Sequence, residues 1–230
     1  MFIIGNGPSL TMEDLNALRN EVTIACNRIY LAFGDTSWRP HYYCVSDPHV
    51  ACHDRQEIER MDAMKFAQEP SWPWLRRADV LFVPEWHTPR MGIERKEWFS
   101  TDLSRGAYGG WTVTYFMLQL AYWLGAQEVY LLGIDHRYVP TTIPGQRNVP
   151  IPWPPPRNHF HPQYEKRCDR LGVHIYAQTL AYLQAKRAYE RDGRIVRNAS
   201  RSTDLKVFER VSLEEVLGNT GLKRTERGYS

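Results

Sequence analysis

The sequence lacks long apolar runs and a leader segment. No stretch of its 230 residues approaches the roughly 18 consecutive apolar residues that a membrane-spanning helix needs. Met1 is followed at once by an apolar segment, without the basic region and cleavage pattern of a secretory signal. We therefore expect no transmembrane segment and a cytoplasmic location.

Cysteine is scarce, and its spacing excludes the common metal-binding motifs. The four cysteines, Cys26, Cys44, Cys52 and Cys168, include no Cys-x-x-Cys pair. Cys26 and Cys44 lie in apolar, strand-like segments, where buried and reduced thiols are expected.

The chain also has little excess charge. Its net charge is +3, and it contains no recognisable RNA- or DNA-binding module, so we expect no nucleic-acid partner. Basic residues gather toward the C-terminal end, at Arg194, Arg197, Arg201, Lys206, Arg210, Lys223, Arg224 and Arg227. Interleaved acidic residues are typical of a solvated face. Peripheral contact with anionic membrane lipids is the alternative.

Short apolar segments alternate with helical patterns, which favours an α/β fold. We predict a single Rossmann-like domain over residues 1–218, with a mostly parallel sheet flanked by helices, and a basic, flexible tail over residues 219–230. Strands are expected at residues 2–4, 22–26, 42–45, 80–83, 129–134 and 194–196, and helices at 12–19, 54–61, 112–124, 176–191 and 213–217.

Residues 139–157 interrupt this alternation with seven prolines. Proline removes a backbone donor and fixes φ, so the segment is neither helix nor strand. Long loops of this kind in compact domains are often functional. We predict a lid over a site, with a plain surface excursion as the alternative.

The most informative segment is Gly5-Asn6-Gly7-Pro8-Ser9, between a predicted strand and a helix start. Glycines let a backbone approach a ligand closely, and a helix N-terminus presents amides to an anion. The segment is neither a complete dinucleotide fingerprint nor a lysine-containing phosphate loop. A nucleotide-binding turn and a purely structural turn are both consistent with it.

Other polar residues come where further predicted strands end. Asn27, Asp47 and the pair Asp135 and His136 occupy such positions. Because the carboxyl ends of parallel strands share one edge of a sheet, where ligands bind, we expect these side chains to converge on a nucleotide or donor site. Turn or capping roles are the alternative for each. At the start of the long apolar helix, the candidates are Gly110, Thr112 and Thr114.

His159 and His161 are the candidates for a catalytic base. Both follow the proline-rich segment. Histidine titrates near neutral pH, as a base that takes a proton from a hydroxyl must. A metal site formed by the two histidines would lack a third ligand at a suitable spacing, so we expect no required metal.

These motifs together resemble two related families. The order of residues 5–10, Cys26-Asn27, Asp47-Pro48, residues 121–135 and Asn158-His159-Phe160 is similar to that of the bacterial sialyltransferases that cap lipooligosaccharide. The chain looks closer to the broader MptE-like family, named for archaeal 6-hydroxymethylpterin diphosphokinase. The resemblance covers roughly residues 2–200 and is carried by short motifs.

The resemblance implies roles for the nucleotide-binding candidates. Asn6 and Asn27 would contact the donor nucleotide. The Thr-Ser-Gly that opens the long helix of the sialyltransferases falls on residues 112–114, where only Thr112 matches. Asp47 stands where those enzymes have asparagine.

The resemblance also bears on the reacting groups. The family base lies four residues beyond the first histidine of its motif. His159 aligns with that first histidine, and the base position is occupied by Gln163. Tyr138 and Arg137 are the candidates for the groups that stabilise the departing phosphate.

The leading hypothesis is a glycosyltransferase that moves a nucleotide-activated sugar, such as a CMP-linked acidic sugar, to a glycan or lipid-glycan acceptor, with His161 or His159 as base. The first alternative is a diphosphokinase that transfers pyrophosphate from ATP, with Asp47 and Asp135 holding Mg²⁺. The second is a non-catalytic nucleotide- or glycan-binding module. Since the similar transferases form symmetric oligomers, a homo-oligomer is also consistent with the resemblance.

Overall fold

A computed structural model describes residues 1–75, 79–88, 97–138, 157–165 and 174–218. The predicted lid, apart from Arg157, and the predicted basic tail lie outside these residues. None of the helices in the described part is long and apolar enough to cross a bilayer.

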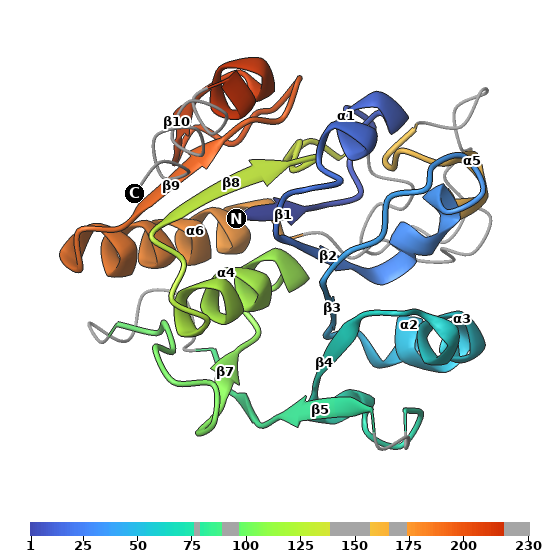
Figure 1. The fold of residues 1–230 in the computed structure, drawn as a ribbon. Coiled ribbons are helices and arrows are strands. Elements are labelled where there is room, and N and C mark those ends of the chain that lie inside the picture. Colours follow the sequence, from blue (N-terminus) through green and yellow to red (C-terminus); the bar gives the residue numbers. More distant parts are fainter. Residues whose placement is uncertain (76–78, 89–96, 139–156, 166–173, 219–230) are drawn as a thin grey trace, which may run out of the picture.

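A parallel sheet forms the centre of the molecule (Figure 1). Within the described residues it has eight strands, in the order β10-β9-β8-β1-β2-β3-β4-β5, and every neighbouring pair is parallel. The strands are β1 (Phe2–Ile4), β2 (Thr23–Cys26), β3 (Tyr42–Val45), β4 (Met64–Gln68), β5 (Val80–Val83), β8 (Glu128–Leu132), β9 (Ile195–Asn198) and β10 (Glu209–Arg210). A separate short pair consists of β6 (Glu85–Trp86) and β7 (Ala107–Tyr108).

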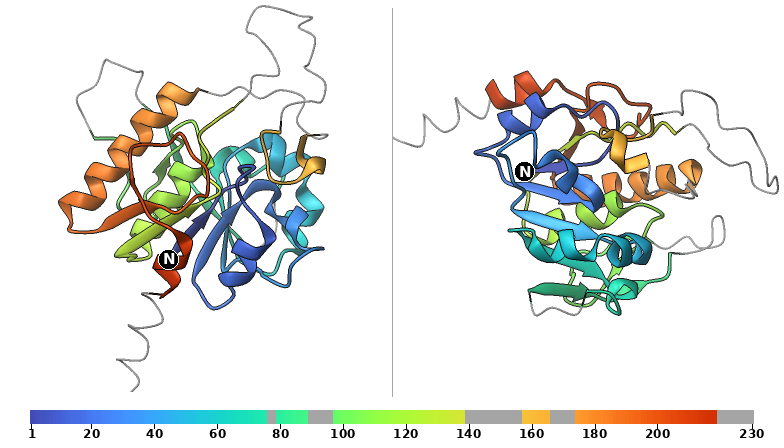
Figure 2. Two further views of the ribbon diagram at one scale, coloured as in Figure 1. Left: turned by 90° about the horizontal axis from the view of Figure 1, so that it is seen from above. Right: turned by 90° about the vertical axis from the view of Figure 1, so that its right-hand side faces the viewer.

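Helices cover both faces of this sheet, which confirms the predicted α/β fold (Figure 2). The labelled α-helices are α1 (Met12–Ala17), α2 (Pro48–His53), α3 (Arg55–Arg60), α4 (Val113–Trp123), α5 (Pro162–Glu165) and α6 (Ile175–Arg191), and the 3-10 helices are η1 (Asn27–Ala32) and η2 (Glu69–Ser71). Residues 213–218 are also helical, where the sequence predicts a helix at 213–217. Along β1, Ile3 packs in the core formed with α4 and α6, whereas Phe2 and Ile4 pack in the core of the opposite face. This alternation follows from the two-residue period of a strand.

Helix α4 is buried nearly all round because nine of its eleven residues are enclosed by the sheet and by neighbouring helices. Its N-cap is Thr112, and the chain leaves the helix at Gly125, whose φ of +85° is the left-handed value that glycine adopts without strain. The sequence predicts this helix at residues 112–124, within one residue of the observed bounds at each end.

The order of the strands creates a topological switch point between β1 and β8. From β1 the chain adds β2 to β5 on one side, and later adds β9 and β10 beyond β8 on the other. The carboxyl edge of the sheet at such a switch point is the usual place for a ligand in this architecture.

Candidate functional site

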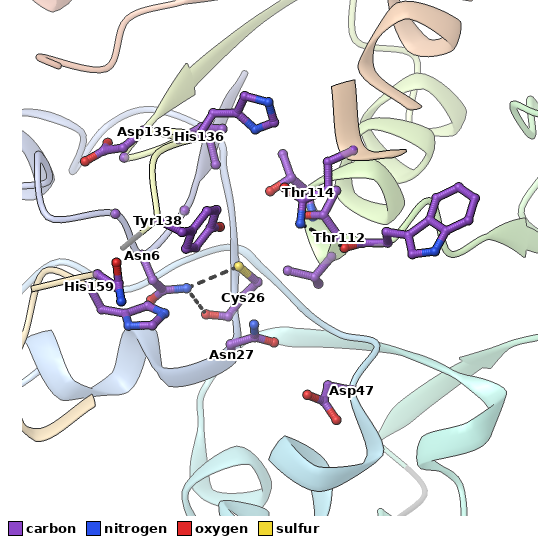
Figure 3. Close-up of a pocket in the computed structure, with 18 of the residues that line it drawn as sticks. Asn6, Cys26, Asn27, Asp47, Thr112, Thr114, Asp135, His136, Tyr138 and His159 are labelled. Carbon is purple, nitrogen blue, oxygen red and sulfur yellow. Dashed lines mark hydrogen bonds between the residues drawn. The ribbon is translucent and has the colours of Figure 1, made fainter. Parts of the chain in front are cut away.

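A pocket of about 290 Å³ lies at this switch point (Figure 3). It is lined by the loops after β1, β2, β3 and β8, the start of α4, one face of α6, and Asn158, His159 and Tyr164; we call it the switch-point pocket. Twelve predicted site residues contribute to its lining: Gly5, Asn6, Gly7, Asn27, Asp47, Thr112, Thr114, Asp135, His136, Arg137, Tyr138 and His159. The structure thus brings together predicted residues that are up to 154 positions apart, from Gly5 to His159. Four predicted residues are not part of the lining: Pro8, Ser9, Gly110 and His161.

The glycines of the first loop permit close contact with the loop after β8. The amide of Gly7 donates to the carbonyl of Gly133 at 2.8 Å. A Cβ atom at Gly5 would come within 2.5 Å of that carbonyl oxygen, and one at Gly7 within 2.7 Å. Neither position has room for a side chain, so the two glycines allow the loops to meet at the floor of the pocket.

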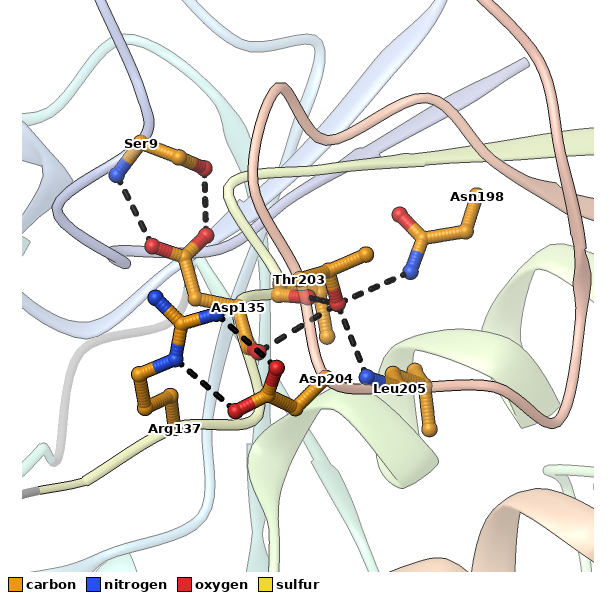
Figure 4. A network of polar contacts seen from close by, with 8 residues as sticks. Ser9, Asp135, Arg137, Asn198, Thr203, Asp204 and Leu205 are labelled. Atoms are coloured by element: carbon orange, nitrogen blue, oxygen red, sulfur yellow. Dashed lines mark hydrogen bonds and ion pairs between the residues drawn. The ribbon is translucent and has the colours of Figure 1, made fainter.

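The carboxylate of Asp135 links the loops after β1 and β8 by hydrogen bonds (Figure 4). It accepts a hydrogen bond of 2.8 Å from the amide of Ser9 and another from the Ser9 hydroxyl. Burial raises the pKa of Asp135, and the bonds from Ser9 partly oppose that effect. Ser9 therefore serves the site indirectly, by bracing Asp135.

The loop after β8 is held from its other side by residues 203–204 (Figure 4). The hydroxyl of Thr203 donates to the Ile134 carbonyl at 2.8 Å, and the amide of Asp204 donates to the Asp135 carbonyl at 2.8 Å. Arg137 forms two bonds of 2.8 Å with the Asp204 carboxylate. The cationic side chain in the pocket lining is thus paired with an acid.

Asn6 and Asn27 present amide oxygens at buried positions in the pocket. The Asn6 side-chain nitrogen donates to the Cys26 carbonyl at 3.1 Å, so the unpaired atom of the Asn6 amide is its Oδ1. Asn27 has a φ of +49°, a left-handed value that asparagine tolerates better than most residues. Neither Oδ1 atom has a hydrogen-bond partner among the described residues. Two buried acceptors in residues that line the pocket are therefore left without a hydrogen bond.

The start of α4 presents a helix N-terminus to the pocket. Gly110 and Trp111 have φ values of +60° and +59°, and they form the turn into the helix. The Thr112 hydroxyl accepts from the Thr114 amide at 3.3 Å, and Gln178 of α6 donates to the Trp111 carbonyl at 3.1 Å. A helix N-terminus carries partial positive charge, so this end of the pocket suits an anion.

Asp47 lies far from Asp135, at the other end of the drawn pocket (Figure 3). Its carboxylate accepts from the His49 amide at 2.8 Å and caps α2. In the described part of the chain, no three histidine, cysteine or acidic side chains are grouped as metal ligands would be.

The three histidines near the site differ in their surroundings. His159 is buried in the pocket, and its ring stacks on Tyr164 with centroids 3.7 Å apart. His161 is outside the lining and accepts from the Gln163 amide at 3.1 Å. His136 contacts the Thr179 hydroxyl at 2.9 Å, and burial lowers its pKa.

Several lining residues come from segments that the sequence argument did not connect with the site. Gln178 and Tyr182 are four residues apart and so share one face of α6, and Tyr164 follows His159 by five residues. The four-residue spacing of Gln178 and Tyr182 could have indicated from the sequence that they share one face of a helix. Their proximity to the pocket depends on the packing of α6 against α4, which the sequence does not reveal.

Comparisons with known proteins were made for sequence and for structure. A family model described as 6-hydroxymethylpterin diphosphokinase MptE-like matches residues 1–141. No protein of curated function matches the chain in sequence. The solved structure of the MAf glycosyltransferase from Magnetospirillum magneticum AMB-1 is similar, with a TM-score of 0.58 at 16% identity. The similarity covers 98% of this chain but 36% of that protein, so this chain spans about a third of its length.

Proposed function

Because the chain belongs to the 6-hydroxymethylpterin diphosphokinase MptE-like family, we propose that it is a transferase that binds a nucleotide-activated sugar in the switch-point pocket. The reaction is glycosyl transfer to a glycan or lipid-glycan acceptor. The donor is a CMP-linked acidic sugar, in keeping with the resemblance of the motifs to those of bacterial sialyltransferases.

The observation that carries this proposal is the combination of hydrogen-bond acceptors and an anion site in one pocket. The free Oδ1 atoms of Asn6 and Asn27 suit the hydroxyl and amino groups of a nucleoside. The N-terminus of α4, with Thr112 at its cap, suits the phosphate. A nucleotide presents both kinds of group on one small molecule.

His159 is the group best placed to act as base, since it is the candidate histidine that lines the pocket. In the proposed step its imidazole takes the proton of an acceptor hydroxyl. The acceptor oxygen forms a bond to the anomeric carbon, and the bond from that carbon to the phosphate oxygen breaks. The nucleotide leaves with the electron pair, next to the start of α4.

The diphosphokinase alternative is supported by the name of the family. It requires Mg²⁺ on the ATP phosphates, with Asp47 and Asp135 as the expected ligands. Their carboxylates lie at opposite ends of the drawn pocket, and each accepts a backbone hydrogen bond. This geometry does not suit one ion held by both, and we favour glycosyl transfer for that reason.

A thermal-shift panel separates the candidates. CMP, UDP, GDP, ADP and ATP are each added with Mg²⁺ and with a chelator. A ligand at 100 times its Kd stabilises the folded state by about 2.7 kcal/mol, which at this size raises Tm by several degrees. Stabilisation by CMP in the chelator supports the proposal, and stabilisation by ATP with Mg²⁺ alone supports the diphosphokinase.

Transfer itself is tested with the His159→Gln variant. The proposal expects wild-type protein to consume a CMP-linked sugar in the presence of an acceptor glycan, and the variant to bind CMP but to lose about 100-fold or more in rate. Nucleotide binding by the wild type without any transfer or hydrolysis would support the non-catalytic binding module.

A further inference from the structure

The ring of His159 is held in an unusual arrangement for this protein. It lies face to face with the ring of Tyr164, with 3.7 Å between centroids and 7° between planes. Other ring pairs at the pocket meet edge-on, as His136 and Tyr182 do at 73°. A parallel stack fixes the plane of an imidazole, because rotation about its χ2 angle would drive the ring into its neighbour.

Tyr164 is itself anchored by a buried ion pair. The Arg28 guanidinium lies over the Tyr164 ring, 5.2 Å from its centroid, and donates to the Tyr164 carbonyl at 3.4 Å. Arg28 also bonds to the carboxylate of Asp54 at 2.7 Å, and both side chains are almost fully buried. The Tyr164 ring, which stacks on His159, is therefore held in place by the buried pair of Arg28 in η1 and Asp54 at the start of α3.

The main chain beside His159 is fixed as well. The amide of Phe160 donates to the Asn6 carbonyl at 2.9 Å, and the Phe160 side chain is buried in the core. The backbone and the ring plane are thus both determined, by separate contacts. The orientation of the His159 imidazole is therefore fixed before any substrate binds.

We propose that Tyr164 is a positioning residue, which orients the His159 imidazole for proton transfer from the acceptor hydroxyl. The inference rests on the proposed function, in which His159 is the base. Its contribution is preorganisation: a base that is already aligned does not lose rotational freedom in the transition state. The aromatic face performs this role, and the tyrosine hydroxyl is not required for it.

The test compares Tyr164→Phe with Tyr164→Leu in the full-length protein. Phenylalanine keeps the stacking face, and leucine removes it while leaving an apolar side chain. We expect the phenylalanine variant to keep kcat within about 3-fold of wild type. We expect the leucine variant to lose roughly 10- to 100-fold in kcat with little change in the KM for the donor, since a small misplacement of a reacting group costs that much.

A second readout does not depend on activity. In a proton NMR spectrum, the His159 Cε1 proton is assigned as the signal lost in His159→Gln. The ring current of Tyr164 should displace that signal upfield in the wild type and in Tyr164→Phe, and the displacement should disappear in Tyr164→Leu. Should the leucine variant not fold, the displacement in the wild type and the phenylalanine variant decides alone.

The two proposals fail in different ways. A wild-type signal without the upfield displacement, or a leucine variant that keeps full kcat, would overturn the positioning role. If the wild-type protein shows the displacement but transfers no sugar, the proposed function is contradicted instead. In that case His159 is oriented by Tyr164 but is not a catalytic base, so the catalytic part of this inference is overturned too.

Discussion

The amide of Ser9 donates a hydrogen bond of 2.8 Å to the carboxylate of Asp135, across 126 positions of sequence. This contact joins the loops after the two central strands, at the point where the chain changes direction in the sheet. The loops after β1 and β8, which both contribute to the switch-point pocket, are therefore held together by a bond between two protein groups. The brace leads to the first prediction.

Replacing Asp135 with alanine should destabilise the protein by about 2 kcal/mol, because the partly buried Ser9 amide loses a charged acceptor. Asp135→Asn keeps an acceptor oxygen for that amide and should cost clearly less. Urea denaturation of both variants measures the difference. Equal stability of wild type and Asp135→Ala would show that the brace does not hold the loops.

Gly7→Ala should destabilise the protein by about 1–3 kcal/mol, since the added Cβ would lie 2.7 Å from the Gly133 carbonyl oxygen and force the loops apart. Gly34→Ala is the matched control, because a Cβ at Gly34 meets nothing within 4 Å. The control should be as stable as wild type or slightly more so. A common loss of stability in both variants would contradict the close approach at Gly7.

Stability should fall as the pH drops from about 7.5 to about 5.5, partly through His136. Burial lowers the pKa of His136 below its ordinary value of 6.5. Below that value the unfolded chain binds a proton that the folded chain does not, so acid favours unfolding. His136→Asn suits the φ of +51° at this position and removes the titrating group.

The measurement for this prediction is the free energy of unfolding of both proteins across that pH range. The His136→Asn variant should show a smaller loss on acidification than wild type does. Identical pH slopes would mean that His136 is not buried in its neutral form.

The strands with the strongest apolar patterns could be predicted from the sequence. Residues 2–4, 42–45 and 80–83 form β1, β3 and β5 with the predicted bounds. Strand β4 was missed because polar Lys65 and Gln68 obscure its pattern, although both are buried. Lys65 reaches Asp79 at 2.7 Å, and this partner is invisible in a local pattern.

Helix α2 was missed for a different reason. Asp47 followed by Pro48 was interpreted as a site residue or as a turn at a strand end, yet the same pair is a favourable helix start. Asp47 caps α2 and Pro48 occupies its first turn. A side chain that caps a helix and lines a pocket satisfies both interpretations.

Convergence of the site could be predicted, since it follows from the rule that parallel strands end at one edge of the sheet. Asn6, Asn27 and Asp135, which follow three different strands, do line one pocket. Which of these polar groups are already hydrogen-bonded within the protein could not be predicted. That the Asn6 oxygen is free while the Asp135 carboxylate is engaged depends on bonds to Cys26 and Ser9, which only the folded chain shows.

The proposed nucleotide site depends most on the two unpartnered amide oxygens of Asn6 and Asn27. Asn27→Gly removes one of them with little strain, because glycine also adopts a positive φ. Its stability should stay within about 1 kcal/mol of wild type, since the lost oxygen has no partner in the described protein.

Calorimetric titration with CMP in the presence of a chelator is the direct test. Wild-type protein should bind CMP, and Asn27→Gly should bind it about 3- to 10-fold more weakly, the equivalent of one hydrogen bond. Failure of CMP to bind the wild type, or equal affinity in the two proteins, would contradict the claim that these oxygens recognise a nucleotide.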